Sequence, residues 1–167
     1  MIRPAAPHDA TDIALIWNAE IRNGVSTFNS IEKTEAEVVE AITTRGTACL
    51  VAEEQGQVLG FATYFQFRGG VGFAHTMEHT IYFAPTARGR GLGRALMAAL
   101  AQTAPDAGAH CLFAGVGAQH AEGQACHARP GSSNVGRPPA SSAALPRARG
   151  VGRRQDSSSS HASHPAP

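Results

Sequence analysis

A strand-like run, a turn rich in glycine and arginine, and a helix-like run follow one another in this 167-residue chain, and this order constrains the fold most. The first two parts read TMEHTIYFAPTARGRGLGR at residues 76–94. The run GLGRALMAALAQTA then carries apolar side chains at helical spacing and is predicted to stop at Pro105. Glycines at such a junction let a backbone approach a ligand, and the first N–H groups of a helix lack intrahelical partners. The turn therefore predicts a phosphate or pyrophosphate site.

The spacing of the turn excludes two common phosphate-binding motifs. A dinucleotide fingerprint that starts at Gly89 needs a glycine where Arg94 stands, and no GK[ST] follows for a P-loop. A purely basic turn, or an RGG-like contact with RNA, stays open from these residues alone.

The pattern along the rest of the chain predicts a mixed sheet. Residues 9–23 read as a helix with Asp9 as its N-cap, and Thr34 with Glu37 forms a capping box for a second helix. The runs CLVAEE and QVLGFATYFQF read as strands joined by the turn at 54–56, and HTIYFA and HCLFAGV as further strands. AEGQACHAR reads as a last helix. This order favours an α/β (α+β) fold with helices on both faces of the sheet.

Composition divides the chain near its C-terminal end. Residues 1–129 carry nine Lys/Arg against twelve Asp/Glu, a balance of −3, whereas residues 130–167 carry five Arg against one Asp, a balance of +4. All ten aromatic residues lie between Trp17 and Phe113, and Ser, Pro and Gly make up half of residues 130–167. Such a segment buries too little apolar surface to offset its ordering entropy. We expect one folded domain at 1–139 and a disordered, low-complexity tail at 140–167.

The sequence predicts a cytoplasmic protein. No apolar run approaches the roughly 18–20 residues that span a bilayer, and no apolar stretch follows Arg3 as in a signal peptide. The odd count of three cysteines without metal-ligand spacing favours reduced thiols over disulfides, and we expect no metal.

Several motifs in the right order resemble one known family. The pattern R-x-x-G-x-G from Arg88 to Gly93, between a strand and a helix, resembles the acyl-CoA signature of the GNAT N-acetyltransferases. The segments TMEHTIYF, NAEIRNGVSTFN and FRGGVGF are similar to the subgroup that acetylates phosphinothricin or methionine sulfoximine and sulfone. The resemblance covers about residues 1–139. It implies a GNAT-type, mostly antiparallel central sheet and acetyl-CoA as cosubstrate.

The resemblance also implies residues that bind the cosubstrate. Backbone groups of Ile81, Tyr82 and Phe83 would pair with the pantetheine arm beside a splayed strand. His120 stands where the family has an asparagine that bonds this arm. Arg88 starts the signature, and the residues that cradle the pyrophosphate would be Gly89, Arg90, Gly91, Leu92, Gly93 and Arg94.

Glu78 is the candidate general base. An amine attacks only as the free base, so a proton must be accepted from its ammonium form. The subgroup has a glutamate at this position, but an ordinary surface carboxylate at a strand start is the alternative. Strand alternation places Glu78, Thr80 and Tyr82 on one face and His79 on the other, so we expect His79 to be a structural hydrogen-bonding residue. The Ile81 N–H is the expected oxyanion donor, and no general acid is assigned.

Arg68 is the candidate cation for an acidic group of the substrate. Its alternative is an exposed arginine at a strand end. Gly69 and Gly70 follow it in the same substrate-side loop, and Phe28 would wall the pocket, unless it is a core aromatic. Ala74 stands where the resemblance implies a second arginine, which leaves the particular acceptor open.

The resemblance fails at the C-terminal end. Pro130 and Ser132 replace an expected leucine and phenylalanine, and nothing matches from residue 140. We expect the final two strands to be missing or replaced, by a shifted reading frame or by divergence, which would leave residues 110–116 as a sheet edge.

The sequence thus predicts an enzyme that acetylates the amine of a small amino-acid-like substrate. The alternatives are a GNAT enzyme for another amine, such as an antibiotic or a protein N-terminus, a catalytically impaired CoA-binding remnant, and a nucleic-acid-binding protein. The acidic balance of residues 1–129 argues against nucleic acid as a partner. No membrane partner is expected, and a homodimer is left open.

Overall fold

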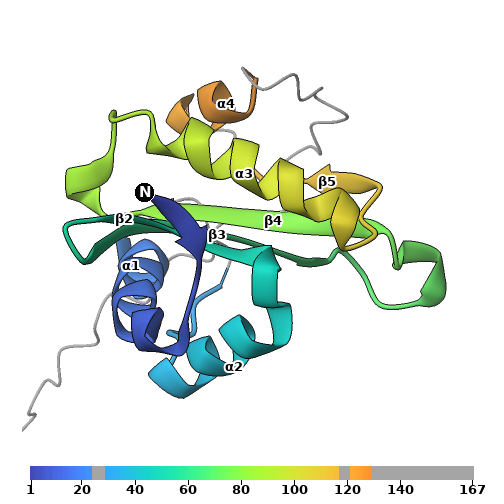
Figure 1. Cartoon of the computed structure of the whole chain (residues 1–167), viewed down its shortest axis with the longest axis horizontal. Coiled ribbons are helices and arrows are strands. Elements are labelled where there is room, and N and C mark those ends of the chain that lie inside the picture. The colour runs from blue at the N-terminus through green and yellow to red at the C-terminus, as the bar shows by residue number, and fades with distance from the viewer. Residues whose placement is uncertain (24–28, 117–120, 129–167) are drawn as a thin grey trace, which may run out of the picture. The chain divides into compact units, whose positions relative to one another are not determined.

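The computed structural model describes residues 1–23, 29–116 and 121–128. All of them belong to the first of the two units into which the chain divides, Met1–Arg137. The strands are β1 Ile2–Pro4, β2 Cys49–Glu54, β3 Gln57–Gln66, β4 Thr76–Phe83 and β5 Cys111–Phe113. The helices are α1 Ala10–Asn23, α2 Glu35–Arg45, α3 Leu92–Asp106 and α4 Ala121–Ala128 (Figure 1).

The five strands form one sheet in the order β1-β2-β3-β4-β5. The first four pair antiparallel, and only β4 and β5 run parallel. This confirms the predicted mixed, mostly antiparallel sheet. Among the described residues β5 is an edge strand, as expected for the region 110–116.

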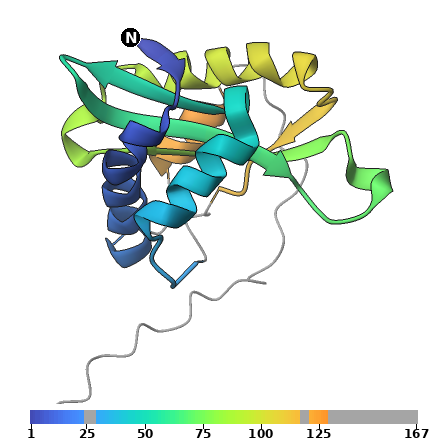
Figure 2. The ribbon, with the colours of Figure 1, turned by 60° about the horizontal axis from the view of Figure 1, so that its bottom comes forward.

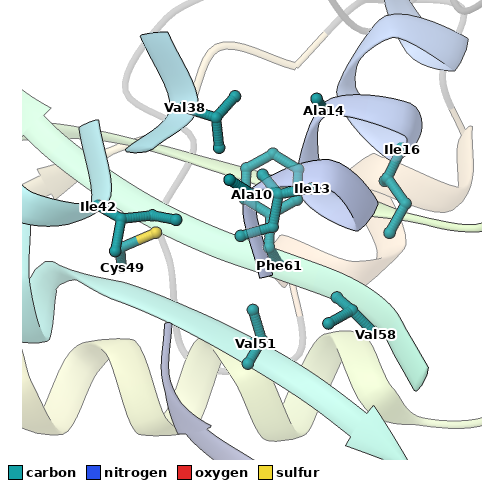
Figure 3. Close-up of a cluster of buried hydrophobic side chains, with 10 residues drawn as sticks. All are labelled: Ala10, Ile13, Ala14, Ile16, Val38, Ile42, Cys49, Val51, Val58 and Phe61. Atoms are coloured by element: carbon teal, nitrogen blue, oxygen red, sulfur yellow. The ribbon is translucent and has the colours of Figure 1, made fainter. Parts of the chain in front are cut away.

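Helices cover both faces of the sheet. Helices α1 and α2 pack on one face, and α3 packs on the other (Figures 1 and 2). Figure 3 shows the core on the α1 and α2 face, which consists of Ala10, Ile13, Ala14, Ile16, Val38, Ile42, Cys49, Val51, Val58 and Phe61. On the α3 face, Leu96 and Leu100 are fully buried against alternate residues of β2 and β3. The alternation of apolar side chains thus explains both layers.

Local signals fix the start of α2 but not that of α1. The Thr34 hydroxyl accepts a hydrogen bond from the Glu37 N–H at 3.2 Å, and the Glu37 carboxylate accepts one from the Thr34 N–H at 2.7 Å, so the capping box is confirmed. The expected capping of α1 by Asp9 is wrong. The buried Asp9 carboxylate accepts hydrogen bonds from the Arg3 guanidinium at 2.7 and 2.8 Å and from the Ala6 N–H instead.

Some predicted boundaries also need correction. Strand β4 begins at Thr76, before the predicted HTIYFA, and β5 ends at Phe113, well short of the predicted end at residue 116. Helix α3 continues one residue past Pro105, because the proline lies in its last turn. Strand β1 was not predicted. It is three residues long, contains a proline and forms only through its pairing with β2.

Several predicted features lie outside the described residues. They are Phe28, His120, Pro130, Ser132 and the tail at 140–167, so the boundary between domain and tail stays a prediction. Within the described residues, no helix is both long and apolar enough to cross a membrane.

Candidate active site

Glu78 lies where strands β4 and β5 part. The parallel pairing of these strands runs from Thr76 with Cys111 to Glu78 with Phe113 and ends there. A Cβ atom on Gly115, just beyond β5, would lie 3.5 Å from Glu78 Oε1, so the carboxylate lies against the backbone of this glycine. The candidate base therefore lies at the fork between the two strands.

The register of β4 shows which of its backbone groups are open at this fork. The Phe67 N–H donates to the Thr76 carbonyl and the Ala84 N–H to the Leu59 carbonyl. In an antiparallel pair these bonds recur at every second residue. Even-numbered residues of β4 therefore bond to β3, and odd-numbered residues direct their N–H and C=O groups toward β5.

The fork thus leaves the backbone groups of Ile81 and Phe83 open on the β5 side of β4. Ile81 and Phe83 lie beyond the last residue that pairs with β5, and among the described residues their groups on that side have no strand partner. Tyr82 is paired through its backbone with Phe61 of β3. The backbone groups of Tyr82 are thus directed toward β3, whereas those of Ile81 and Phe83 are open toward β5.

Side chains of β4 alternate between the two faces as predicted. Tyr82 packs with Trp17 and Phe61 on the α1 and α2 face, whereas Met77, Ile81 and Phe83 pack on the α3 face. Glu78, two and four residues from Thr80 and Tyr82, shares their face.

His79 links the two strands on the opposite face. Its Nδ1 lies 3.0 Å from the Phe113 carbonyl oxygen, which can only accept, so Nδ1 carries the proton and donates. Nε2 is then an acceptor, and it is buried without a hydrogen-bond partner among the described residues. Burial, with a smaller effect of His127, lowers the pKa of His79 from 6.5 to about 4. The expected structural role of His79 is confirmed by this hydrogen bond.

Aromatic side chains gather beside Glu78. Phe67 stacks on Phe113 with ring centroids 5.3 Å apart and meets Phe73 edge-on at 6.2 Å. The Arg68 guanidinium lies 5.3 Å from the Phe67 ring centroid, and its side chain is exposed. Gln66 Nε2 donates to the carbonyl oxygens of Arg68 and Gly70, which holds the loop that also contains Gly69. Phe67, Phe73 and Phe113 form an aromatic shelf, which connects Arg68 with Phe113, the residue of β5 that pairs with Glu78.

The turn before α3 has the open backbone that an anion requires. Gly89 and Gly91 have φ angles of 75° and 77°, a region that favours glycine, and a Cβ atom on either would meet nothing within 4 Å. Gly91 is the N-cap of α3 and offers no side-chain cap, so Leu92 and Gly93 begin the helix with N–H groups that lack intrahelical partners. The positive end of the helix dipole lies at the same place.

The arginines of this turn are not equivalent. Arg88 forms an ion pair with Glu20 of α1, which is only 7% exposed, and Arg90 makes two hydrogen bonds to Glu54 at 2.7 and 2.9 Å. Arg94 is exposed and has no ion-pair partner within the described part of the chain. The side chains of Arg88 and Arg90 therefore attach the turn to α1 and β2. The backbone of the turn and the side chain of Arg94 are available to a ligand.

Comparison with known proteins identifies the family of this chain. Residues 16–131 match the model of the Acetyltransferase (GNAT) family. The chain belongs to the GNAT acetyltransferase family. The predicted resemblance is confirmed, and the chain is an acyl-CoA-dependent N-acetyltransferase.

Two relatives and one solved structure show the subgroup. The chain is 37% identical to the L-amino acid N-acyltransferase MnaT of Escherichia coli (strain K12) over 123 residues, 71% of each protein. It is 36% identical to the L-methionine sulfoximine/L-methionine sulfone acetyltransferase of Salmonella typhimurium over 68% of this chain and 62% of that protein. A phosphinothricin acetyltransferase from Sinorhizobium meliloti, solved in complex with acetyl-CoA, superposes with a TM-score of 0.73 at 30% identity and covers 78% of this chain and 73% of its own.

The structure brings several of the predicted site residues together. Glu78 and the open backbone of β4 lie at the fork, Arg68 lies against Phe67 in the loop after β3, and the glycine turn follows β4. Arg45, the last residue of α2, was not predicted as part of any site. An arginine in the last turn of a helix usually lies at the surface, where its charge interacts favourably with the helix dipole. The position of Arg45 in the sequence therefore does not indicate a binding role.

Proposed function

We propose that this chain transfers the acetyl group of acetyl-CoA to the amine of a small amino-acid-like acceptor of the methionine sulfone, methionine sulfoximine or phosphinothricin type. One observation carries the proposal. A carboxylate, Glu78, lies at the point where β4 and β5 part, with open backbone groups on one side of it and an aromatic shelf with a cation on the other.

The described residues fit acetyl-CoA. The open C=O group of Ile81 and the open N–H and C=O groups of Phe83 suit the amide-bearing pantetheine arm, and the backbone of residues 89–94 suits the pyrophosphate. When bound, acetyl-CoA supplies a thioester that an amine can attack. In this assignment Arg94 contributes charge to the phosphate site, and Arg88 and Arg90 hold the turn in place.

Glu78 accepts the proton that the acceptor ammonium must lose before its nitrogen can attack. Its position beside Gly115 leaves no side chain from that residue between the carboxylate and the fork. The Ile81 N–H, directed toward β5, is placed to donate to the acyl oxygen as negative charge develops there.

The aromatic shelf and its loop select the acceptor. Phe67, Phe73 and Phe113 provide an apolar wall for an aliphatic side chain, and Arg68 provides a charged donor for a sulfonyl or phosphinyl oxygen. A polycationic acceptor such as an aminoglycoside would meet Arg68 with like charge.

A panel of amines tests the function. Purified protein, acetyl-CoA and each amine are mixed, and released thiol is measured. We expect turnover with methionine sulfone, methionine sulfoximine or phosphinothricin that exceeds turnover with aminoglycosides and with an N-terminal peptide. The proposal fails if the amino acids give no thiol above background while one of the other amines is acetylated.

A further inference from the structure

Arg45 lies on the same face of the sheet as Glu78 and is only partly exposed. Its Nη1 donates a hydrogen bond to Thr63 Oγ1 at 3.1 Å. Its Cζ lies 5.0 Å from the ring centroid of Phe65. Both contacts are with β3, so the guanidinium lies over that strand.

Most other arginines of the described region are compensated by a carboxylate. Arg3 pairs with Asp9 and Glu53, and the remaining ion pairs are Arg22 with Glu32, Arg88 with Glu20 and Arg90 with Glu54. Arg68 and Arg94 have no carboxylate partner among these residues, but both are exposed and hydrated. Arg45 combines partial burial with the absence of a described carboxylate partner.

This combination costs free energy unless a ligand compensates it. A partly buried cation loses hydration, and a hydroxyl and an aromatic ring return only part of that loss. In agreement, burial lowers the pKa of Arg45, and only a weaker interaction with Cys49 opposes the shift. Of its five N–H donors, the hydrogen bond to Thr63 uses one.

The register places this cation next to the candidate base. Thr63 pairs with Thr80, and Phe65 pairs with Glu78. Side chains directly opposite in an antiparallel pair have Cβ atoms about 4.5–5.5 Å apart. Arg45 therefore covers β3 beside Glu78, and Arg68 lies in the loop after β3, against Phe67.

We propose that Arg45 binds the α-carboxylate of the acceptor and so makes the enzyme selective for amino acids over amines that lack a carboxylate. This inference rests on the proposed function and deepens it. A guanidinium can bind a carboxylate with two parallel hydrogen bonds, which fixes orientation as well as charge. With the carboxylate at Arg45 and the polar end of the side chain at Arg68, the amine between them lies at Glu78.

Two acceptors that differ only in charge separate binding by Arg45 from a purely structural role. Methionine sulfone carries the carboxylate, and its carboxamide has almost the same shape without the charge. We expect Arg45→Gln to raise the KM for methionine sulfone at least tenfold and to change the KM for the carboxamide less than twofold. Arg45→Lys keeps the charge but loses the two parallel N–H donors of the guanidinium. Its KM for methionine sulfone should therefore lie between those of the native enzyme and Arg45→Gln.

Arg22→Gln is the matched control, because it removes one positive charge from an exposed ion pair on α1. It should leave the ratio of the two KM values unchanged. Thermal melts of all variants show whether each one folds. An equal rise in KM for acid and carboxamide in a folded Arg45→Gln protein contradicts the proposal, as does a native enzyme that uses both acceptors equally well.

Calorimetric binding of the two acceptors decides the point independently of turnover. Binding of methionine sulfone that is lost in Arg45→Gln supports the role of Arg45 even if no acceptor is acetylated, in which case only the proposed function fails. If amino acids are acetylated but Arg45→Gln does not change their binding, the proposed function stands and this inference is overturned. Absence of methionine sulfone binding to the native protein also overturns this inference.

Discussion

Strand β4 is paired with β3 from Met77 to Phe83, but with β5 only from Thr76 to Glu78. The same strand thus has one closed edge and one edge that opens at its middle. The closed edge is filled by backbone hydrogen bonds and core side chains, whereas the open edge carries the base and two residues with open backbone groups. Strand β4 therefore provides stability along one edge and a binding surface along the other.

The largest expected effect concerns the base at the fork. Glu78→Gln keeps the size of the side chain and removes its basicity, so turnover should fall by roughly 10²–10⁴, with little change in CoA affinity. The measurement is steady-state turnover with saturating acetyl-CoA, together with a CoA titration. Turnover close to that of the native enzyme at neutral pH means that the open edge does not contain the base.

A second effect concerns the link between the strands at the fork. Because the pKa of His79 is about 4 in the folded chain, below the ordinary histidine value of 6.5, the unfolded chain takes up this proton first as the pH falls. The contribution of neutral His79 to the free energy of unfolding is therefore fully present above pH 6.5. It decreases by roughly 3 kcal/mol as the pH falls to 4. His79→Asn cannot titrate, so denaturant melts should show this decrease in the native chain only.

Asp9 does not interfere in that range of pH. Hydrogen bonds from Arg3 lower the pKa of the Asp9 carboxyl below 3.8, so its contribution is lost only at lower pH. A native chain and a His79→Asn variant with parallel stability curves between pH 4 and 6.5 would show that the imidazole is not buried as a neutral group.

The closed edge should respond through stability. A Cβ atom on Gly60 would lie 2.2 Å from Phe83 Cδ1 and 2.8 Å from the Tyr82 carbonyl oxygen. Gly60→Ala should therefore destabilise the chain by about 1–3 kcal/mol, the usual cost of overpacking. Gly72→Ala, where a Cβ meets nothing within 4 Å, is the control and should melt like the native chain. Equal melting of both variants contradicts the packing of this edge.

The turn beyond the open edge should respond through affinity. Gly91→Val should weaken CoA binding at least tenfold, because a side chain at this position blocks the approach of the pyrophosphate. Gly108 has the same φ of 77° at the other end of α3, so Gly108→Val introduces the same backbone strain away from the turn. Calorimetry should show weaker CoA binding for Gly91→Val only. A similar loss in both variants assigns the effect to strain.

The sequence predicts the closed parts of this fold better than the open ones. The capping box of Thr34 and Glu37 and the alternation along β4 are local patterns, and both are confirmed. Strand β1 forms only because β2, which is distant in the chain, pairs with it. The ion pair of Asp9 with Arg3 depends on how the backbone between these two residues folds back. Neither leaves a periodic signal in the sequence.

The site follows the same rule. Glu78 and the glycine turn could be predicted because the motif that contains them is contiguous. The limits of pairing between β4 and β5, which leave Ile81 and Phe83 open, depend on where β5 ends. The position of Arg45 depends on how α2 packs on β3, and no spacing in the sequence shows this.

Residue-resolved amide exchange of β4, with and without saturating acetyl-CoA, tests the open edge most directly. We expect the amides of Ile81 and Phe83 to exchange more slowly when acetyl-CoA is bound, because the acyl oxygen accepts from Ile81 and the pantetheine arm accepts from Phe83. The amides of Thr80 and Tyr82, which already donate to β3, should not change. Unchanged exchange at Ile81 and Phe83 in the saturated protein would contradict the assignment of this edge to the cosubstrate.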